Sequence, residues 1–192
     1  MNLQTRVIGI LTRPSTEWPI IAADPSDVPT LYREYIGVLA AIPAVCLLLG
    51  LSLIGVPFLG RVGVTTALVA AIMTYVTALA SAYIAALVVE KLAPTFQSTG
   101  NIAQALKLVA YAYTPVWVAG VLYLFVALAP LAVLAAVYAI YLFYLGLSPV
   151  MKTPSDKVVP YMIVSALVVI VVNIVFRLLV SAIGGVPSYA RF

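Results

Sequence analysis

Histidine is absent from this chain, and cysteine occurs once, as Cys46. A zinc site of Cys and His ligands, an intramolecular disulfide and a catalytic histidine are therefore excluded. Cys46 lies in an apolar run, which favours a small buried residue over a reactive thiol. Nucleotide-binding glycine loops, metalloprotease motifs and paired acids within one apolar segment are also missing. The sequence predicts no enzyme, no cofactor and no metal site.

Charge is scarce as well. Charged residues make up 8% of the 192 residues and apolar residues 65%, and the mean hydropathy is +1.18. This is the composition of an integral membrane protein. The net charge is +4, but the basic residues are scattered singly along the chain. That pattern argues against nucleic acid as a partner and suits topology signals in a membrane protein.

The longest uncharged stretch runs from Leu108 to Met151. As one helix it would be about 66 Å long, roughly twice the thickness of a bilayer's hydrocarbon core. The chain must therefore fold back within this stretch. Proline removes a backbone donor and disfavours helix before it, so we predict the hinge at Ala129–Pro130.

We predict an all-α membrane protein with five transmembrane helices, preceded by a short amphipathic interfacial helix. Residues 1–30 form a cytoplasmic or interfacial segment, 31–185 the transmembrane domain and 186–192 an external tail. The five predicted spans are about 35–59, 64–89, 108–128, 131–150 and 158–183, each long enough to cross a bilayer.

The predicted interfacial helix rests on the spacing of its apolar residues. Leu3, Val7, Ile10 and Leu11 share one helical face, which would lie against the membrane surface. Trp18 follows shortly after and suits an anchor at the level of the lipid headgroups.

The Lys and Arg residues of the loops predict the orientation. Two of them, Arg61 and Arg191, fall on one side of a five-span topology. The larger set on the other side comprises Arg6, Arg13, Arg33, Lys91, Lys107, Lys152 and Lys157. The positive-inside rule therefore predicts a cytoplasmic N-terminus and an external C-terminus.

Small residues recur along one face of the second predicted span. They are Ala67, Ala71, Thr74, Ala78, Ser81 and Ala85. Because lipid supplies no hydrophobic drive for helix association, close packing depends on such small side chains. Three interpretations stay open: packing within the bundle, the interface of a homo-oligomer, or a cavity lined by Thr74 and Ser81.

The fifth predicted span carries two polar residues on one face, Asn173 and Arg177. Polar residues at membrane depth are candidates for function. Arg177 would lie near the outer interface, where it can snorkel, and Asn173 would bond another helix or contact a substrate. At the end of the second span, Glu90 could pair with Lys107 or Lys152. Solvation at the interface is the favoured interpretation of this residue, and proton handling is the alternative.

The third predicted span contains Pro115 and Trp117. Pro115 removes a helical hydrogen bond and should kink the span, either as a fixed bend or as a hinge. Trp117 is too deep for an interfacial belt, so we expect it to face the bundle.

Several motifs resemble those of bacterial members of the Yip family. They lie at 11–22, 31–36, 40–44, 111–120, 141–147 and 152–157. The resemblance implies five spans and a cytoplasmic N-terminus. Eukaryotic relatives bind Rab-type GTPases through a long acidic N-terminal region, whose nearest counterpart here is Thr30–Tyr32. No functional residue is therefore carried over.

We accordingly expect a non-enzymatic protein of the bacterial inner membrane that acts through contacts with lipids or proteins. Its expected partners are membrane lipids, further copies of the chain, or an unidentified membrane or cytoplasmic protein. The alternative is a small-molecule or ion transporter or channel. Thr74, Ser81, Asn173 and Arg177 would line its pathway, and Pro115 would serve as the hinge.

Overall fold

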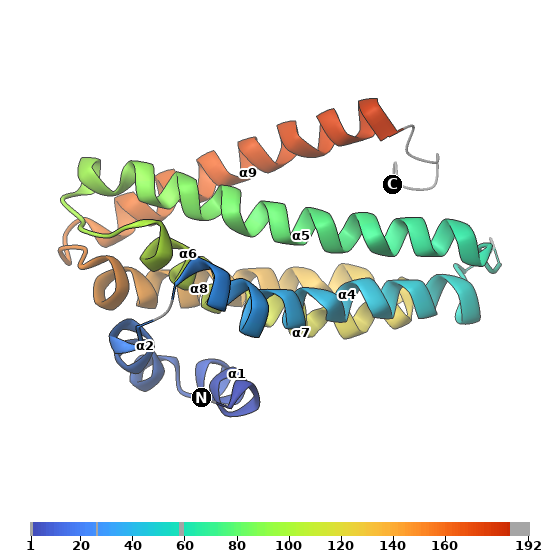
Figure 1. Cartoon of the computed structure of the whole chain (residues 1–192), viewed down its shortest axis with the longest axis horizontal. Helices are drawn as coiled ribbons and strands as arrows, with labels where there is room; N and C mark the ends of the chain where they lie inside the picture. The colour runs from blue at the N-terminus through green and yellow to red at the C-terminus, as the bar shows by residue number, and fades with distance from the viewer. Residues whose placement is uncertain (1, 26, 58–59, 185–192) are drawn as a thin grey trace.

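The computed structural model describes residues 2–25, 27–57 and 60–184, with side chains for all of these except 173 and 176–184. This part of the chain is an elongated bundle of helices, and its only strand-like pairing is one bridge between Val56 and Gly60. The two long helices labelled α4 and α5 run side by side along the bundle (Figure 1). The predicted tail at 186–192 lies outside the described residues.

Most of the elements are α-helices, with short π-helical (η1, η2) and 3₁₀ (η3, η4, η5) turns at their ends. In chain order they are α1 (Leu3–Thr12), α2 (Pro14–Ala23), α3 (Val28–Leu31), η1 (Tyr32–Ile36), α4 (Gly37–Leu49), η2 (Gly50–Ile54), α5 (Val64–Leu92), η3 (Ala93–Phe96), α6 (Ile102–Ala112), α7 (Thr114–Ala119), η4 (Gly120–Leu124), η5 (Val126–Leu131), α8 (Ala132–Met151) and α9 (Val158–Gly184).

Three helical stretches are long and apolar enough to cross a membrane: Val28–Ile54, Val64–Phe96 and Val126–Met151. A fourth candidate is the bent pair of Ile102–Ala112 and Thr114–Leu124. These stretches overlap the first four predicted spans, and α9 overlaps the fifth. The first stretch ends at Ile54 and the third at Leu124, before the predicted ends at 59 and 128. Within α9, the stretch Val158–Val172 is apolar but shorter than a full span. The chain is therefore a helical membrane protein, and the count of five spans stays a prediction.

The chain reverses between the third and fourth stretches at Phe125, before the predicted hinge at Ala129–Pro130. Phe125 has an extended backbone, with φ −110° and ψ 93°, between the 3₁₀ turns η4 and η5. Pro130 lies inside η5, just ahead of α8. Pro130 is the fifth residue of the helical run that begins at Val126, so its missing N–H removes a backbone hydrogen bond without ending the helix. The reversal therefore lies at the extended residue Phe125 rather than at the proline.

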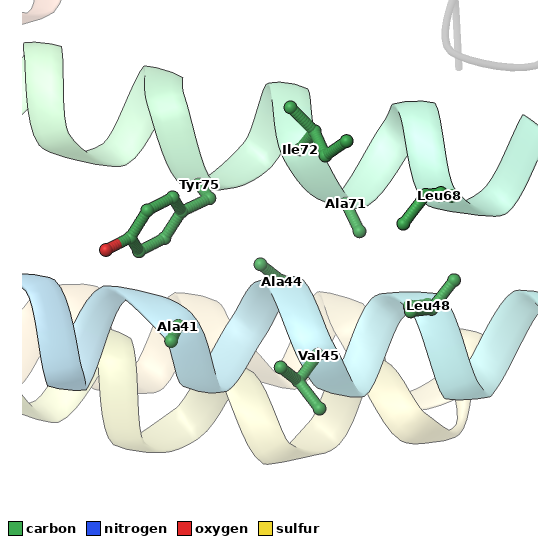
Figure 2. A pocket seen from close by; sticks show the side chains of 8 residues that line it. All are labelled: Ala41, Ala44, Val45, Leu48, Leu68, Ala71, Ile72 and Tyr75. Carbon is green, nitrogen blue, oxygen red and sulfur yellow. The ribbon is translucent and has the colours of Figure 1, made fainter.

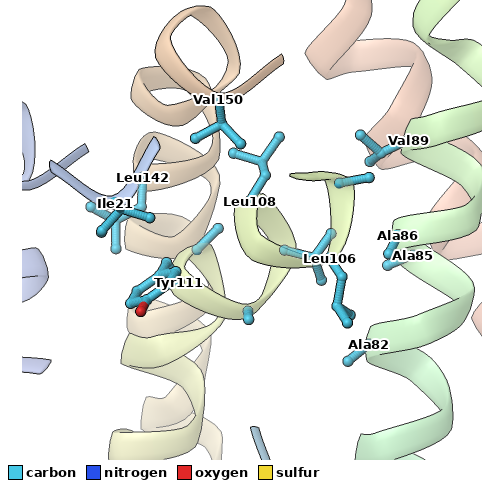
Figure 3. Close-up of a cluster of buried hydrophobic side chains, with 14 of the residues drawn as sticks. Ile21, Ala82, Ala85, Ala86, Val89, Leu106, Leu108, Tyr111, Leu142 and Val150 are labelled. Carbon is cyan, nitrogen blue, oxygen red and sulfur yellow. The ribbon is translucent and has the colours of Figure 1, made fainter. Parts of the chain in front are cut away.

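The core is built around α6. Every residue from Ala105 to Ala112 is buried, as expected of a helix enclosed on all sides. In Figure 3, Leu106 faces the small residues of α5, whereas Tyr111 lies toward Leu142 of α8 and Ile21 of α2. The large apolar side chains of α8 near Leu131, and many of those on α5 and α9, are instead exposed. One end of the bundle thus has a protein core, and the rest presents apolar side chains outward.

The bent pair that ends at Leu124 also approaches α4 closely. A Cβ atom on Gly120 would lie 2.5 Å from the Cβ of Pro43. Only a residue without a side chain permits this distance, and such small residues let helix backbones meet in a membrane.

Candidate functional site

The most unusual feature of the structure is a cluster of four charged residues against the core. Arg6 of α1 is 3% exposed and donates to the carboxylates of Glu17, at 3.3 Å, and Asp24, at 3.1 Å. Lys107 of α6 is buried and donates to the backbone carbonyl of Asp24. We call Arg6, Glu17, Asp24 and Lys107 the ionic cluster. Its two positive and two negative charges balance, which is what burial of charge requires.

Glycine at position 9 lets this cluster form. A Cβ atom on Gly9 would lie 2.5 Å from the Cδ of Glu17. The missing side chain leaves room for Glu17 to turn back from α2 toward Arg6 on α1. Pro14 begins α2 directly after α1, so the two helices fold into a pair with their charged side chains facing each other. We call α1 and α2 the N-terminal helix pair.

Aromatic packing fixes the N-terminal helix pair to the bundle. Trp18 is 1% exposed, and its ring meets the edge of Tyr111, with centroids 6.3 Å apart. A Cβ atom on Gly146 of α8 would lie 2.6 Å from Cζ2 of Trp18. The indole Nε1 is buried and has no hydrogen-bond partner in the described part of the chain. An unsatisfied buried donor is costly, so the packing of the indole ring must supply the free energy that holds Trp18 in this place.

The sequence-based expectations for this N-terminal region need two corrections. Trp18 is not an exposed headgroup anchor, because α8 and α6 enclose it. The apolar face of α1 packs against the protein core, with Ile10 buried and Val7 and Leu11 beside it. Tyr138 of α8 also donates to the carbonyl of Leu11, at 2.9 Å. The helix pair thus docks on the bundle, and its position relative to the membrane surface stays a prediction.

A polar contact lies next to this cluster, at the bend of the third stretch. The helical axis bends by 41° between α6 and α7, where Pro115 stands in the first turn of α7. The hydroxyls of Tyr35 and Thr114 are 2.7 Å apart, and Thr114 donates to the carbonyl of Ala110 at 3.3 Å. Since Thr114 has one hydroxyl proton, Tyr35 is the donor between the two hydroxyls. Trp117 is buried and faces the bundle.

The small-residue face of α5 lies mostly against other helices of the same chain. Ala67, Ala71 and Ala85 are buried, while Thr74, Ala78 and Ser81 are half-buried. Thr74 donates its hydroxyl proton to the carbonyl of Ala70 in its own helix, at 2.8 Å. These positions are compatible with packing within the bundle, and the role of this face stays a prediction. The side chains of Asn173 and Arg177 lie outside the part of the chain that the structure describes.

The expected partners of Glu90 were wrong. Glu90 pairs with its neighbour Lys91, at 3.3 Å, and Lys107 is engaged by Asp24. In the sequence, Lys107 was the residue that could have indicated the ionic cluster, because it is the one charged residue of α6. Its acceptors could not be identified from sequence, because Asp24 is far from it along the chain.

A second surface feature lies between α4 and α5. Four residues of each helix line a hollow of about 270 Å³ that opens to the outside (Figure 2). Ala44 and Ala71 form its floor, both 6% exposed. We call this the α4–α5 groove, and its lining residues are Ala41, Ala44, Val45, Leu48, Leu68, Ala71, Ile72 and Tyr75.

Neither feature resembles a catalytic centre. The ionic cluster joins charges to opposite charges and to a carbonyl, which is an arrangement that holds two parts of a chain together. The groove has apolar walls and one tyrosine, which suits contact with hydrocarbon. The geometry therefore supports docking and lipid contact.

Comparisons with known proteins agree with the motifs in the sequence. A family model described as the Yip1 domain matches residues 8–176. No curated protein and no solved structure matches the chain significantly. The matched range includes most of the ionic cluster, the α4–α5 groove and all four candidate membrane-spanning stretches. This chain belongs to the Yip1-domain family of membrane proteins.

Proposed function

We propose that this chain is a non-enzymatic, five-span protein of the bacterial inner membrane that acts through contacts with lipids and proteins. The observation that carries the proposal is the α4–α5 groove, an open hollow whose walls are apolar. It lies between two of the stretches able to cross a membrane. A surface of this kind contacts hydrocarbon or another helix and offers little to a hydrated solute.

The exposed apolar residues support the same proposal. Val133, Leu134 and Val137 of α8 are each more than 60% exposed, and α5 exposes Val69 and Ile72 by about half. Such a surface needs a lipid solvent or a protein partner, because exposed apolar patches of this extent mark membrane or protein contacts. Further copies of this chain, or another membrane or cytoplasmic protein, are the protein partners we propose.

The alternative, a transporter or channel, would need polar residues from several helices to meet in one cavity. Its one supporting observation is the 41° bend at Pro115, which could serve a moving helix. Thr74 argues against this alternative, because its hydroxyl proton is given to the carbonyl of Ala70.

A flux measurement separates the two functions. Purified protein in liposomes is expected to leak K⁺ and protons no faster than empty liposomes, because an apolar groove does not replace an ion's hydration shell. Ion-sensitive dyes trapped in the liposomes report the rate. Flux above that of empty liposomes, lost on Pro115→Ala, would instead favour a transporter with a hinge.

A topology measurement tests the number of spans. Five crossings place the two ends of the chain on opposite sides, with the N-terminus cytoplasmic because the basic loops lie on its side. A reporter active only in the cytoplasm should therefore work when fused to the N-terminus and fail at the C-terminus. Activity at both ends would reduce the chain to an even number of spans.

A further inference from the structure

A hollow with polar walls lies where α6 begins and α8 ends, and both of these points are at the same end of the bundle (Figure 1). Its volume is about 270 Å³. Ile102 and Met151, which end these helices, also end two of the stretches able to cross a membrane. The hollow therefore lies at the level where such stretches leave the hydrocarbon and meet the lipid headgroups. We call it the α6–α8 hollow, and its lining residues are Thr99, Gly100, Asn101, Gln104, Val150 and Lys152.

Hydrogen bonds between two loops hold this hollow in shape. The backbone N–H of Thr99 donates to the carbonyl of Met151, and the hydroxyl of Ser98 donates to that of Thr153, each at 2.9 Å. Ser98 and Thr153 are both buried. Gly100 permits the close approach of the loops, since a Cβ atom there would lie 2.7 Å from Cε of Met151. The lining residues are thus positioned before a ligand arrives, which lowers the cost of binding.

The side chains of the hollow offer hydrogen-bond donors. The Oδ1 of Asn101 already accepts from the backbone N–H of Gln104, at 3.0 Å. The Oε1 of Gln104 is buried, away from the open space. The groups left for a ligand are the two amide NH₂ groups, the hydroxyl of Thr99 and the ammonium of Lys152. Such a set suits a ligand that is rich in acceptor oxygens.

Lys152 adds a positive charge that no acid balances. Lys91 and Lys157 each pair with the adjacent carboxylate, at 3.3 and 3.6 Å, whereas Lys152 has no ion pair among the described residues. None of the residues that line the hollow is acidic. The backbone of Lys152 is left-handed, with φ 52° and ψ 38°. Glycine or asparagine is the usual residue in this conformation, so the end of α8 alone does not explain a lysine there.

We propose that the α6–α8 hollow binds a phosphate group, which a lipid headgroup or a free phosphate can supply. A phosphate is an anion whose acceptor oxygens match these donors, and lysine binds it as a point charge. Thr99, Asn101 and Gln104 supply the directed hydrogen bonds. Anionic headgroups collect at basic residues beside membrane-spanning helices, which makes lipid the nearest source. The inference rests on the lipid-contact function proposed above and adds a headgroup site to its apolar surfaces.

Protection of Lys152 from acetylation tests the site in the full chain. The protein in micelles of an uncharged maltoside detergent reacts with acetic anhydride, and mass spectrometry gives the rate at each lysine. Dioctanoyl phosphatidylglycerol should slow the reaction of Lys152 about tenfold at about ten times its dissociation constant. Lys91 and Lys157 do not line the hollow and should react as before. Equal slowing of all three lysines, or no slowing of Lys152, would overturn the site.

Two further additives identify the source of the phosphate. Dioctanoylglycerol has the same acyl chains without the phosphate and should not protect Lys152. If it protects as well as the phospholipid does, the proposal is wrong, because the chains and not the phosphate cover the lysine. Inorganic phosphate that protects Lys152 as well as the lipid assigns the site to free phosphate. Inorganic phosphate that fails where the lipid succeeds assigns it to the headgroup.

Asn101→Asp should abolish the protection, because it places a carboxylate among the donors. Aspartate caps a helix about as well as asparagine, so α6 should keep its first turn. Gln104→Glu makes the same change of charge at a second lining position. Gln97→Glu is the matched control, since Gln97 is exposed in the same loop but does not line the hollow.

The rates with and without lipid are compared within each variant, which removes the effect of the new charge on Lys152 itself. Protection that survives both lining substitutions would contradict the site, as would an equal loss of protection in Gln97→Glu. None of these results changes the flux or the topology measurement, so the site can fail while the proposed function stands.

Discussion

Arg6→Met is expected to lower the free energy of unfolding by about 2–4 kcal/mol. The substitution leaves the carboxylates of Glu17 and Asp24 without their guanidinium, and breaking a buried pair costs about 3–5 kcal/mol. The expected loss of stability lies below this range because Glu17 is 17% and Asp24 39% exposed, so water solvates part of each carboxylate. Denaturation in detergent micelles measures the stability, and hydrogen exchange should show faster exchange confined to α1 and α2.

Arg33→Met is the matched control. Arg33 also pairs with a carboxylate, Glu34, at 3.4 Å, but both side chains are mostly exposed. Such a surface pair is worth about 0–1 kcal/mol. A balanced variant separates charge from packing. Arg6→Met combined with Glu17→Gln removes one positive and one negative charge and leaves Lys107 with Asp24, so it should recover part of the loss. Equal effects of Arg6→Met and Arg33→Met would show that the ionic cluster does not hold the N-terminal helix pair.

The helical membrane class followed from the sequence, because it depends on local composition. The candidate stretches overlap the predicted spans, and their number stays a prediction. Apolar stretches of this length have few alternatives in a bilayer. The reversal at Phe125 did not follow, since an extended residue between two 3₁₀ turns has no strong sequence signal. Proline was the more visible breaker, but Pro130 lies inside the helical run that leads into α8 and does not end it.

The ionic cluster and the groove could not be predicted from the sequence for a different reason. Both depend on residues that are distant in the sequence, such as Asp24 with Lys107, and Ala44 with Ala71. A single sequence shows the excess of charge in residues 1–30 but not its acceptors. The sequence indicated the small residues of α5, but it did not indicate which helix packs against them. The amphipathic pattern of α1 was genuine, but a helix face that suits lipid also suits a protein core.

The two features divide the molecule into two kinds of surface. Around α6, the N-terminal helix pair covers the bundle and completes a protein core. Along α4 and α5 the apolar side chains stay open. Removing the helix pair should therefore loosen the core around Tyr111 while leaving the groove intact, because no residue of α1 or α2 lines it.

Gly146→Ala is expected to destabilise the protein by about 1–3 kcal/mol, the usual cost of overpacking a core. The new Cβ would lie 2.5 Å from Cδ1 of Leu108 and 2.6 Å from Cζ2 of Trp18. Neither side chain has free space, since both are fully buried. The sign of the change in stability is informative, because alanine in place of glycine inside a helix usually stabilises a protein by about 0.5–1 kcal/mol. The emission of Trp18, measured in a Trp117→Phe background, should shift to the red as the ring leaves its site.

Gly63→Ala provides the control, since a Cβ atom there meets nothing within 4 Å. Its effect should not exceed about 1 kcal/mol, the amount by which alanine is the poorer residue at a helix N-cap. Trp18→Phe removes the ring atoms that a Cβ on Gly146 would strike, so the double variant should lose less stability than the sum of the single ones. For residues in contact this coupling is about 0.5–3 kcal/mol. Additive losses would mean that Gly146 and Trp18 do not share the contact that fixes α2 to α8.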